Sequence, residues 1–304
     1  MYDLLIIGGG PAGLTAAVYT ARKKLRSLLV SKDLGGQVNE TLRVENYMGY
    51  QFIEGPELME KFNSQVRQYP IEVKLETKVT ELRRLDGGFE AVTDGGVTYR
   101  AKAVIYAAGK RARQLNVPGE ARLRGKGVTY CAICDGPLFS GEKVAIVGGG
   151  NSALEAVNDM VRIAQHVYVV SLTPLTADPI LIEKAKDAPN LTIFAEHVTE
   201  EVLGQDFVEG IIIRDLKTGE KKRLEGRGGF VEIGLIPNSE PVAGLVRLNE
   251  WKEVPINRYC EAGVPGLYAA GDVTDVPEKQ IVVAAGEGSK AALQAHRYLM
   301  RLKE

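Results

Sequence analysis

The chain has 304 residues, of which 45% are hydrophobic and 25% charged, and its formal net charge at pH 7 is -1. These values are typical of a globular protein with enough chain for two domains. A charge near zero without a Lys/Arg-rich run argues against nucleic-acid binding, and no apolar run approaches the roughly 18 residues of a membrane span. The first residues are also too short an apolar stretch for a secretory leader, so we expect a cytoplasmic protein that binds neither nucleic acid nor membranes.

The first predicted elements are a strand over residues 4–7, a glycine turn, and an alanine-rich helix over residues 15–22. This order is typical of a dinucleotide site. Gly8 permits the tight turn, Gly10 lets the backbone approach a pyrophosphate, and Gly13 allows the helix to pack closely on the strand. One such turn is weak evidence, because glycine-rich turns between strand and helix also occur without a ligand.

Further along the chain, Cys131 and Cys134 form a Cys-x-x-Cys pair. Two thiols at this spacing can close a disulfide, and a helix N-terminus or a nearby charge can hold one of them as a thiolate. Zinc needs four ligands, and neither a second cysteine pair nor suitably spaced histidines accompany this one, so we expect redox chemistry and no metal. Asp135 is either a general acid for a leaving thiolate or a turn or capping carboxylate. The third cysteine, Cys260, is expected to be a small core or surface residue without a redox role.

The strand, glycine turn and helix recur 140 residues later, where residues 144–147 lead into Gly148 and Gly150 and a second helical pattern over 155–163. Ala153 takes the place of the third glycine. Two copies in one register favour two nucleotide-binding domains.

Turn-forming clusters at residues 116–119 and 237–241 bracket the second glycine turn, and we expect them to be two strands of one hinge. Residues 211–213 and 229–233 are predicted strands, and residues 284–302 a helix. We therefore predict an α/β fold of two Rossmann-like, three-layer ββα domains, the second inserted into the first. The expected limits are 1–114 and 242–304 for the first domain and 115–241 for the inserted one.

The two glycine turns, the cysteine pair followed by Asp-Gly, and the segments 117–120, 234–238 and 270–272 occur together in one chain. In this combination the whole chain resembles the low-molecular-weight, FAD-dependent thioredoxin reductases. Residues 35–38, 134–139, 148–152 and 276–280 are closer still to the flavoprotein subunit of alkyl hydroperoxide reductase. That subunit carries an extra disulfide module before its flavin strand, and here Met1 begins at that strand, so we expect a likeness to its reductase core only.

The resemblance implies FAD in the first domain, NADH or NADPH in the inserted domain, and a homodimer. It implies that Cys134 faces the flavin and that Cys131 attacks the disulfide of a thioredoxin or glutaredoxin-like protein, with the inserted domain rotating about its hinge between the two steps. Within the flavin site, Val79 would lie near the adenine, Asp272 at the ribityl chain, and Gln280 and Ile281 at the pyrimidine end. The residues that would hold FAD are Gly8, Gly10, Pro11, Ala12, Gly13, Gly35, Gly36, Gln37, Val38, Asn46, Val79, Ala108, Gly109, Gly271, Asp272, Gln280 and Ile281. The residues that would hold the second nucleotide are Gly148, Gly150, Asn151, Ser152 and Ala153.

The electron donor is where the sequence departs from the family. About 20 residues beyond its glycines, a dinucleotide fold carries an acid for the ribose of NAD or arginines for the phosphate of NADP. Here the corresponding segment, Ser171 to Thr176, has neither, although Ser171 and Thr173 offer uncharged hydrogen-bonding groups. We expect either a nicotinamide nucleotide with weakened recognition, slightly favoured because the glycine turn is intact, or another donor such as ferredoxin or a reduced deazaflavin. The first site also lacks the acid, with Ser31 and Asp33 following its strand, and in the family this omission is common.

Two other functions are compatible with the same residues. One is an NADH oxidase or peroxiredoxin-linked reductase, and the other is a nucleotide-sensing protein that kept the fold without the activity. The intact cysteine pair, with Asp135 and Gln280, argues against the second.

Overall fold

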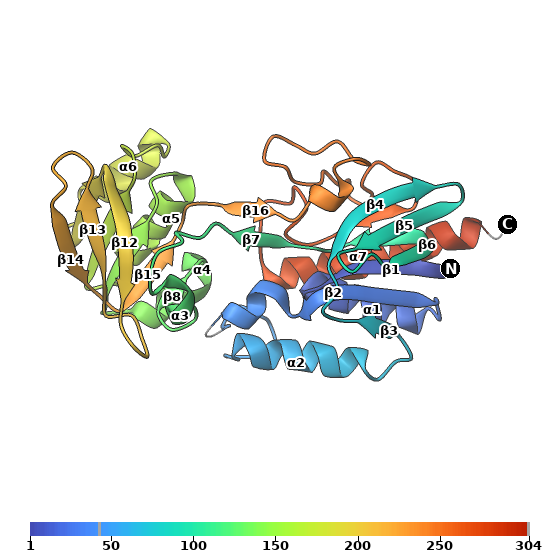
Figure 1. The fold of residues 1–304 in the computed structure, drawn as a ribbon. Helices are drawn as coiled ribbons and strands as arrows, with labels where there is room; N and C mark the ends of the chain where they lie inside the picture. Colours follow the sequence, from blue (N-terminus) through green and yellow to red (C-terminus); the bar gives the residue numbers. More distant parts are fainter. Residues whose placement is uncertain (42–43, 303–304) are drawn as a thin grey trace.

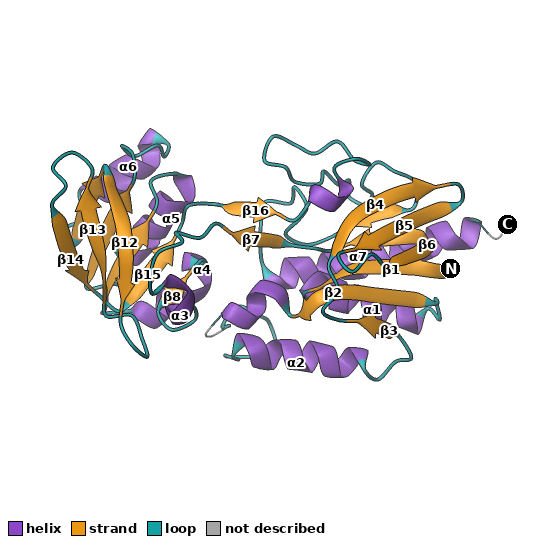
Figure 2. Cartoon of the chain, viewed as in Figure 1, coloured by secondary structure: helices purple, strands orange, loops and turns teal. Residues whose placement is uncertain are grey.

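Two bodies joined by a pair of strands make up the molecule, and both ends of the chain lie in the same body (Figure 1). A computed structural model describes residues 1–41 and 44–302. The chain leaves the first body along β7 (Lys110–Ala112) and returns along β16 (Leu235–Pro237), and these strands pair antiparallel. Figure 2 shows that the crossing between the bodies consists of these two strands and their flanking loops. The predicted α/β fold, with one Rossmann-like domain inserted into another, is confirmed.

A seven-stranded sheet forms the first domain, in the order β3-β2-β1-β6-β5-β4 with β17 beside β6. Residues 4–7 of β1 are at most 4% exposed, because β1 lies between two parallel neighbours and is covered on both faces, which explains its unbroken apolar run. Its strands are β1 (Tyr2–Gly9), β2 (Ser27–Leu34), β3 (Glu72–Lys74), β4 (Val79–Leu85), β5 (Gly88–Thr93), β6 (Thr98–Tyr106) and β17 (Leu267–Ala269). Its helices are α1 (Pro11–Arg22), η1 (Gly36–Glu40), α2 (Gly55–Val66), η3 (Glu240–Val242) and α7 (Ile281–Arg301).

Helices α1 and α7 pack together against this sheet. A Cβ atom on Gly288 would lie 2.1 Å from the carbonyl oxygen of Ala12, so only glycine allows the helices to come this close. Leu14, Ala291 and Leu299 from the two helices share one apolar core with the β1 side chains of Leu4 and Ile6. The close packing fixes the first glycine turn, which connects β1 to α1.

The inserted domain has a parallel sheet, an antiparallel sheet and helices. The parallel sheet has the order β11-β10-β9-β15-β8, and β12, β13 and β14 form the antiparallel sheet. Its strands are β8 (Val128–Thr129), β9 (Lys143–Val147), β10 (His166–Ser171), β11 (Leu191–Ala195), β12 (His197–Leu203), β13 (Gly210–Asp215), β14 (Lys221–Glu225) and β15 (Gly228–Val231). Its helices are α3 (Glu120–Leu123), α4 (Ala132–Asp135), η2 (Gly136–Phe139), α5 (Asn151–Met160) and α6 (Pro179–Lys186). No helix in the described ranges has both the length and the apolar character needed to cross a bilayer.

Several predicted elements are found with shifted ends. The last helix begins at Ile281, three residues before the predicted Ala284, and the helix after each glycine turn begins directly at the turn. The predicted hinge cluster at 116–119 lies beyond β7, where the carbonyl of Pro118 accepts a hydrogen bond from Val202 N of β12 at 2.9 Å. That cluster therefore belongs to the body of the inserted domain, and β7 itself makes the crossing. The domain limits at 115 and 241 stay predictions.

Candidate active site

The first glycine turn has the geometry of a phosphate cradle. Gly8 has φ +110, and a Cβ atom on Gly13 would lie 1.8 Å from the Gly8 carbonyl oxygen, so both positions require glycine. A Cβ atom on Gly10 would have no atom within 4 Å, so the space beside it is open. Pro11 opens α1, no side chain caps the helix, and no acidic residue lies in its first turn. The turn thus offers backbone N–H groups and the positive end of the helix to an anion.

Predicted flavin residues from distant parts of the chain contact one another in the first domain. Asn46 Nδ2 donates a hydrogen bond to Gln280 Oε1 at 3.1 Å, although the two residues are 234 positions apart. Ile281 and Val38 pack in one small apolar cluster with residues of α2. Gly35 has φ +102, and a Cβ atom there would lie 2.5 Å from Asn39 Oδ1. This close contact turns the 35–38 segment back over the end of β2.

The turn before α7 is held by a residue that the sequence reasoning missed. Glu287 is 5% exposed, and its Oε2 accepts a hydrogen bond from Gly271 N at 2.7 Å. Burial raises the pKa of Glu287, which the Gly271 amide partly offsets. The sequence feature that could have identified Glu287 is that it is the single acid in the alanine- and glycine-rich stretch 284–288. Glu287 fixes the backbone from which Asp272 projects.

A buried ionic group lies where the first domain meets the hinge. Lys110 Nζ is 2.6 Å from Glu253 Oε1, and Lys279 Nζ is 3.3 Å from the same oxygen. Burial raises the pKa of Glu253, but the hydrogen bonds from Lys110 and Asn249 and the charge of Lys279 outweigh it and leave that pKa below its usual value. Burial also raises the pKa of Asp272, and the same two lysines partly offset it. Lys110, the first residue of β7, is thereby held beside Asp272, a predicted flavin residue.

The remaining predicted flavin residues are placed as follows. Asn238 donates from Nδ2 to the Ala108 carbonyl at 2.8 Å and from its backbone N to the Gly109 carbonyl at 3.0 Å, which joins the end of β6 to the returning chain. Val79 is 6% exposed, and its side chain belongs to the core of the first domain. Only backbone groups of Val79 are therefore in a position to contact a cofactor.

The second glycine turn repeats the first. Gly148 has φ +148, and its Cβ atom would lie 2.2 Å from the carbonyl oxygen of Glu232. Beside Gly150 the space is open, the nearest atom to a built Cβ being Thr176 Oγ1 at 4.0 Å. No side chain caps α5, and Asn151 and Ser152 in its first turn are exposed. The arrangement suits a second pyrophosphate.

A serine within β2 of the first domain and a serine at the end of β10 of the inserted domain lie under the turns and do not point outward. Ser31 and Ser171 are 140 residues apart, in the same register as the glycines, and are 8% and 2% exposed. Ser31 Oγ accepts a hydrogen bond from Gly9 N at 2.9 Å, and a Cβ atom on Gly149 would lie 2.2 Å from Ser171 Oγ. The expectation that Ser171 can contact a ribose is therefore corrected, because its hydroxyl is buried against the turn. Thr173 is exposed and donates to the Pro174 carbonyl at 3.0 Å.

The cysteine pair forms a disulfide at the start of α4. Cys131 and Cys134 are bonded, with 5.3 Å between their Cα atoms. Cys131 is the N-cap of α4, and its Sγ accepts a hydrogen bond from Cys134 N at 3.2 Å. The helix thus directs an N–H group at the sulfur of Cys131, an arrangement that favours a thiolate after reduction.

Asp135 is buried behind the disulfide, with 2% of its surface exposed. The Thr129 hydroxyl donates a short hydrogen bond to Asp135 Oδ2, and the same Thr129 Oγ1 accepts from Cys131 N at 3.3 Å. Because Cys131 and not Asp135 caps α4, the capping interpretation of Asp135 does not hold for this helix. One threonine therefore connects the carboxyl group to the backbone of the disulfide.

A chain of polar contacts leads from the first domain to the hinge by way of the disulfide segment. Arg124 Nη1 is 2.9 Å from Glu40 Oε1 of η1, and its guanidinium lies over the Tyr130 ring with 4.8 Å to the centroid. Tyr130 Oη donates to Glu120 Oε1 at 2.9 Å. The Glu120 carboxylate also accepts hydrogen bonds from the backbone N of Leu115 and Asn116 at 2.8 and 2.7 Å. The orientation of the two domains is thus connected to the residue before Cys131.

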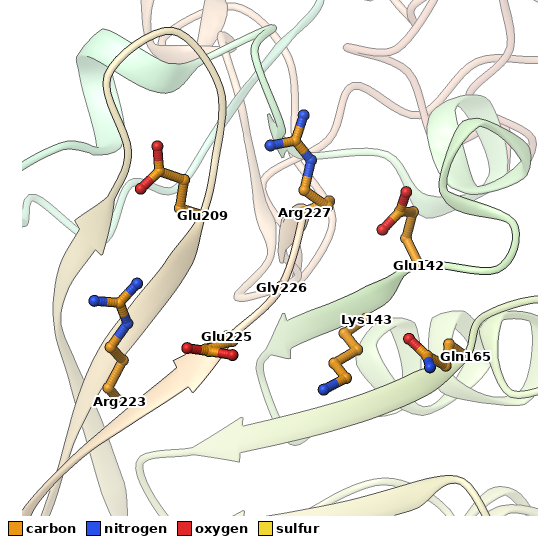
Figure 3. A pocket seen from close by; sticks show the side chains of 8 residues that line it. All are labelled: Glu142, Lys143, Gln165, Glu209, Arg223, Glu225, Gly226 and Arg227. Atoms are coloured by element: carbon orange, nitrogen blue, oxygen red, sulfur yellow. The ribbon is translucent and has the colours of Figure 1, made fainter.

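Two other features lie away from this site. Cys260 is fully buried in the core between α1 and α7, and burial raises the pKa of its thiol to about 11, so it is a core residue. A hollow of about 380 Å³ lies at the edge of the inserted domain where β9 begins, whereas Gly148 follows the end of β9 (Figure 3). No predicted site residue lines it; the lining residues are Glu142, Lys143, Gln165, Glu209, Arg223, Glu225, Gly226 and Arg227. Among the described residues, no group of three or more His, Cys, Asp or Glu side chains is arranged to hold a metal.

Known proteins are similar to this chain in sequence and in structure. Residues 2–288 match the pyridine nucleotide-disulphide oxidoreductase family. An NADH dehydrogenase of Bacillus subtilis and a subunit of alkyl hydroperoxide reductase from Staphylococcus epidermidis are each 42% identical over 301 residues. Thioredoxin reductase of Streptococcus pyogenes has a TM-score of 0.93 at 34% identity, with 99% of each chain covered. The predicted resemblance is confirmed.

The matches differ in how much of each relative they include. The two curated relatives are matched over 99% of this chain but only 59% of their own length. The thioredoxin reductase structure is matched from end to end.

Proposed function

The chain belongs to the pyridine nucleotide-disulphide oxidoreductase family, and from this premise we propose that it is an FAD-dependent reductase of thioredoxin-like protein disulfides. The observation that carries the proposal is the Cys131–Cys134 disulfide at the start of α4, in a domain inserted between the two halves of a nucleotide-binding fold. The family implies FAD together with NADH or NADPH.

The first domain has the groups that FAD needs. Gly10 and the uncapped start of α1 would take the pyrophosphate, and Asp272 would accept hydrogen bonds from the ribityl hydroxyls. The Asn46–Gln280 pair and Ile281 would meet the pyrimidine end of the ring. When bound, FAD supplies the electron pair that opens the disulfide.

The chain's own residues then carry the exchange. Two electrons and two protons convert the Cys131–Cys134 disulfide into two thiols. The thiolate of Cys131 attacks the substrate disulfide, forming a mixed disulfide and releasing one substrate thiolate, which takes a proton. Cys134 then attacks the Cys131 sulfur, which releases the reduced substrate and restores the internal disulfide.

Asp135 is the proposed acid of this sequence. Its burial at the end of α4 and its hydrogen bond from Thr129 keep it close to the backbone of Cys131. From there it would supply the proton for a departing thiolate.

Domain rotation is part of the proposal. The Arg124–Glu40 contact holds the residue after α3 against η1, and Figure 1 shows α4 on the side of the inserted domain that faces the first domain. A protein substrate needs the same side of α4, so the inserted domain must turn about β7 and β16. We also propose a homodimer, which light scattering of the purified protein tests.

The proposed donor is NADH or NADPH, with ferredoxin or a reduced deazaflavin as the second candidate. The intact turn at Gly148 and Gly150 supports the nicotinamide donor. The second candidate is supported by the absence of charged residues between Ser171 and Ala177 and by the burial of Ser171. A peroxiredoxin-linked reductase is a third candidate, supported by the likeness to the alkyl hydroperoxide reductase relative.

One anaerobic experiment separates the nicotinamide donors from ferredoxin and tests thioredoxin as the acceptor. The FAD-loaded protein is mixed in turn with NADH, NADPH and reduced ferredoxin, flavin absorbance is followed, and oxidised thioredoxin is then added. We expect a nicotinamide nucleotide to bleach the flavin and thioredoxin thiols to appear. The Cys134→Ser enzyme should still be bleached and should consume oxygen in air without reducing thioredoxin; thioredoxin reduction by this variant would overturn the cysteine assignment.

A further inference from the structure

Glu232 connects the disulfide helix to the second glycine turn, and none of the steps above uses it. It directly follows β15, and its backbone N donates to the Val147 carbonyl at 2.8 Å. Its own carbonyl oxygen lies 2.2 Å from where a Gly148 Cβ atom would be. The backbone of Glu232 is therefore fixed beneath the second turn.

The Glu232 side chain reaches the first turns of two helices. Its Oε1 accepts a hydrogen bond from Ala132 N of α4 at 3.2 Å, and it is also hydrogen-bonded to the Ser152 side chain of α5. Both helix starts direct positive partial charge at the same carboxylate. No sequence motif marks this position.

This carboxylate shares the start of α4 with the reactive sulfur. Cys134 N donates to Cys131 Sγ at 3.2 Å, while the neighbouring Ala132 N is taken by Glu232. A helix start lowers the pKa of a thiol by favouring its anion, and a carboxylate at the same place opposes that effect by charge repulsion.

The charge of Glu232 changes within the neutral range. Burial, against the hydrogen bonds from Ala132 and Ser152 and with a smaller contribution from the charge of Glu155 on α5, raises its pKa to about 7. Two other charged groups lie on elements next to Glu232. Asp135 of α4 is hydrogen-bonded to Thr129, and Arg113 of the hinge lies beside Gly234. β8 has no titratable side chain, and Lys143 lies at the far end of β9.

We propose that Glu232 is a positioning residue for the disulfide, holding the first turn of α4 against the second glycine turn and, by its charge, controlling how readily Cys131 becomes a thiolate. The inference rests on the proposed function, since it concerns the thiol that attacks the substrate. Below neutral pH Glu232 is uncharged and the helix start acts on Cys131 unopposed. Above neutral pH the carboxylate raises the pKa of the Cys131 thiol.

Alkylation kinetics of the reduced protein test this role without relying on turnover. Wild type, Glu232→Gln and the control Asp159→Asn, which removes one exposed charge from the same α5, are reduced and freed of reductant. Iodoacetamide labelling of Cys131 is then timed by mass spectrometry from pH 5.5 to 9. Glu232→Gln should lower the thiol pKa by about half a unit or more, and Asp159→Asn should leave it unchanged.

The redox equilibrium of the pair gives a second readout. In thiol redox buffers at pH 8, Glu232→Gln should favour the reduced form of the pair about three- to tenfold, because the thiolate is no longer repelled. Near pH 5.5, where wild-type Glu232 is itself uncharged, the two proteins should converge. Glu232→Asp, which keeps the charge, should stay close to wild type, and the uncharged Glu232→Ser replaces the Gln variant if that one does not fold.

The outcomes separate this inference from the proposed function. If Glu232→Gln matches wild type in both readouts, or Glu232→Asp behaves as the neutral variant should, the Glu232 proposal is wrong. If reduction of wild type exposes no alkylatable Cys131, the proposed function itself fails.

Discussion

The two glycine turns have similar backbones, and each lies over its own buried serine, but their surroundings differ. In the domain of the first turn, predicted FAD residues from distant parts of the chain contact one another, as in the Asn46–Gln280 hydrogen bond. Around the second, the segment after Ser171 folds back so that Thr176 N and Ala177 N donate to the Gly149 carbonyl at 2.7 and 3.0 Å. The exposed side chains of residues 172–177 are uncharged, and the first charged residue after them is Asp178, which is hydrogen-bonded to Asn151.

The repeated turn therefore supplies the pyrophosphate site, and the residues that flank it select the ligand. Both turns leave space beside the middle of the motif, at Gly10 and Gly150. The position that reads the ribose in other dinucleotide folds is filled in both domains by a serine buried under the turn. Tight binding at the first site thus depends on the residues around FAD, and the second site has fewer groups with which to select a nucleotide.

The largest effect should come from a negative charge placed in each turn. Gly10 and Gly150 have φ -78 and -91, which any residue adopts, and both have open space for a side chain. Gly10→Glu should therefore fold but lose FAD, with affinity reduced more than about 100-fold by repulsion of the pyrophosphate. Gly150→Glu should keep FAD and lose bleaching by the nicotinamide nucleotide. Flavin absorbance after gel filtration and anaerobic mixing measure the two effects; bleaching of Gly150→Glu at the wild-type rate would show that the second turn does not hold the donor.

Locking the two domains together should have the next largest effect. Cysteines at positions 40 and 124, where the side chains now meet at 2.9 Å, can be joined by a short bifunctional maleimide. We expect the crosslinked enzyme to lose repeated thioredoxin reduction but to complete a single reduction of Cys131–Cys134, counted by thiol labelling. A crosslink between positions 57 and 61 within α2 is the matched control. Full turnover of the interdomain crosslink would rule out the rotation.

Breaking the buried ionic group of the first domain should lower the free energy of unfolding more than breaking an exposed ion pair of the inserted domain. Glu253→Gln leaves Lys110 and Lys279 without their carboxylate and should cost about 3–5 kcal/mol of unfolding free energy. Because the pKa of Glu253 is lowered on folding, its contribution is present above the unfolded pKa of about 4.3 and is lost as pH falls through the folded value. Urea unfolding at pH 7 and pH 3.5 tests this, with Glu196→Gln of the exposed Lys217 pair as the control. Equal effects of the two substitutions at pH 7 would contradict the account.

The smallest effect should come from reversing the interdomain ion pair. Arg124→Glu should shift the domain orientation, seen by small-angle scattering, with little change in stability, because both partners are partly exposed. Adding Glu40→Arg should restore the wild-type scattering curve. Arg122→Glu is the control, since Arg122 bonds only to carbonyls of the inserted domain in the described contacts. An Arg124→Glu curve identical to wild type would mean that the contact does not hold the orientation.

The fold and the turns could be predicted because they depend on short patterns. An apolar run ending in spaced glycines determines strand, turn and helix locally, and the copy 140 residues later confirms the register. The disulfide followed from the spacing of Cys131 and Cys134. Element ends were less accurate, as at Ile281, since they depend on packing against the rest of the domain.

The remaining features depend on contacts between distant residues. The Asn46–Gln280 hydrogen bond was accessible only through the family resemblance. Ser171 looked like an available hydroxyl because its burial depends on the depth of the turn above it. Glu232 and Glu287 appear in the sequence as ordinary acids, and only the folded chain brings them to Ala132 and Gly271.

Trapping of a mixed disulfide tests the central claim most directly. The reduced Cys134→Ser protein is mixed with oxidised thioredoxin, and the products are separated without reductant and weighed by mass spectrometry. The account predicts a one-to-one adduct through Cys131, because the thiol that would resolve it has been removed, and no adduct with Cys131→Ser. An adduct formed equally by Cys131→Ser, or by neither variant, would contradict it.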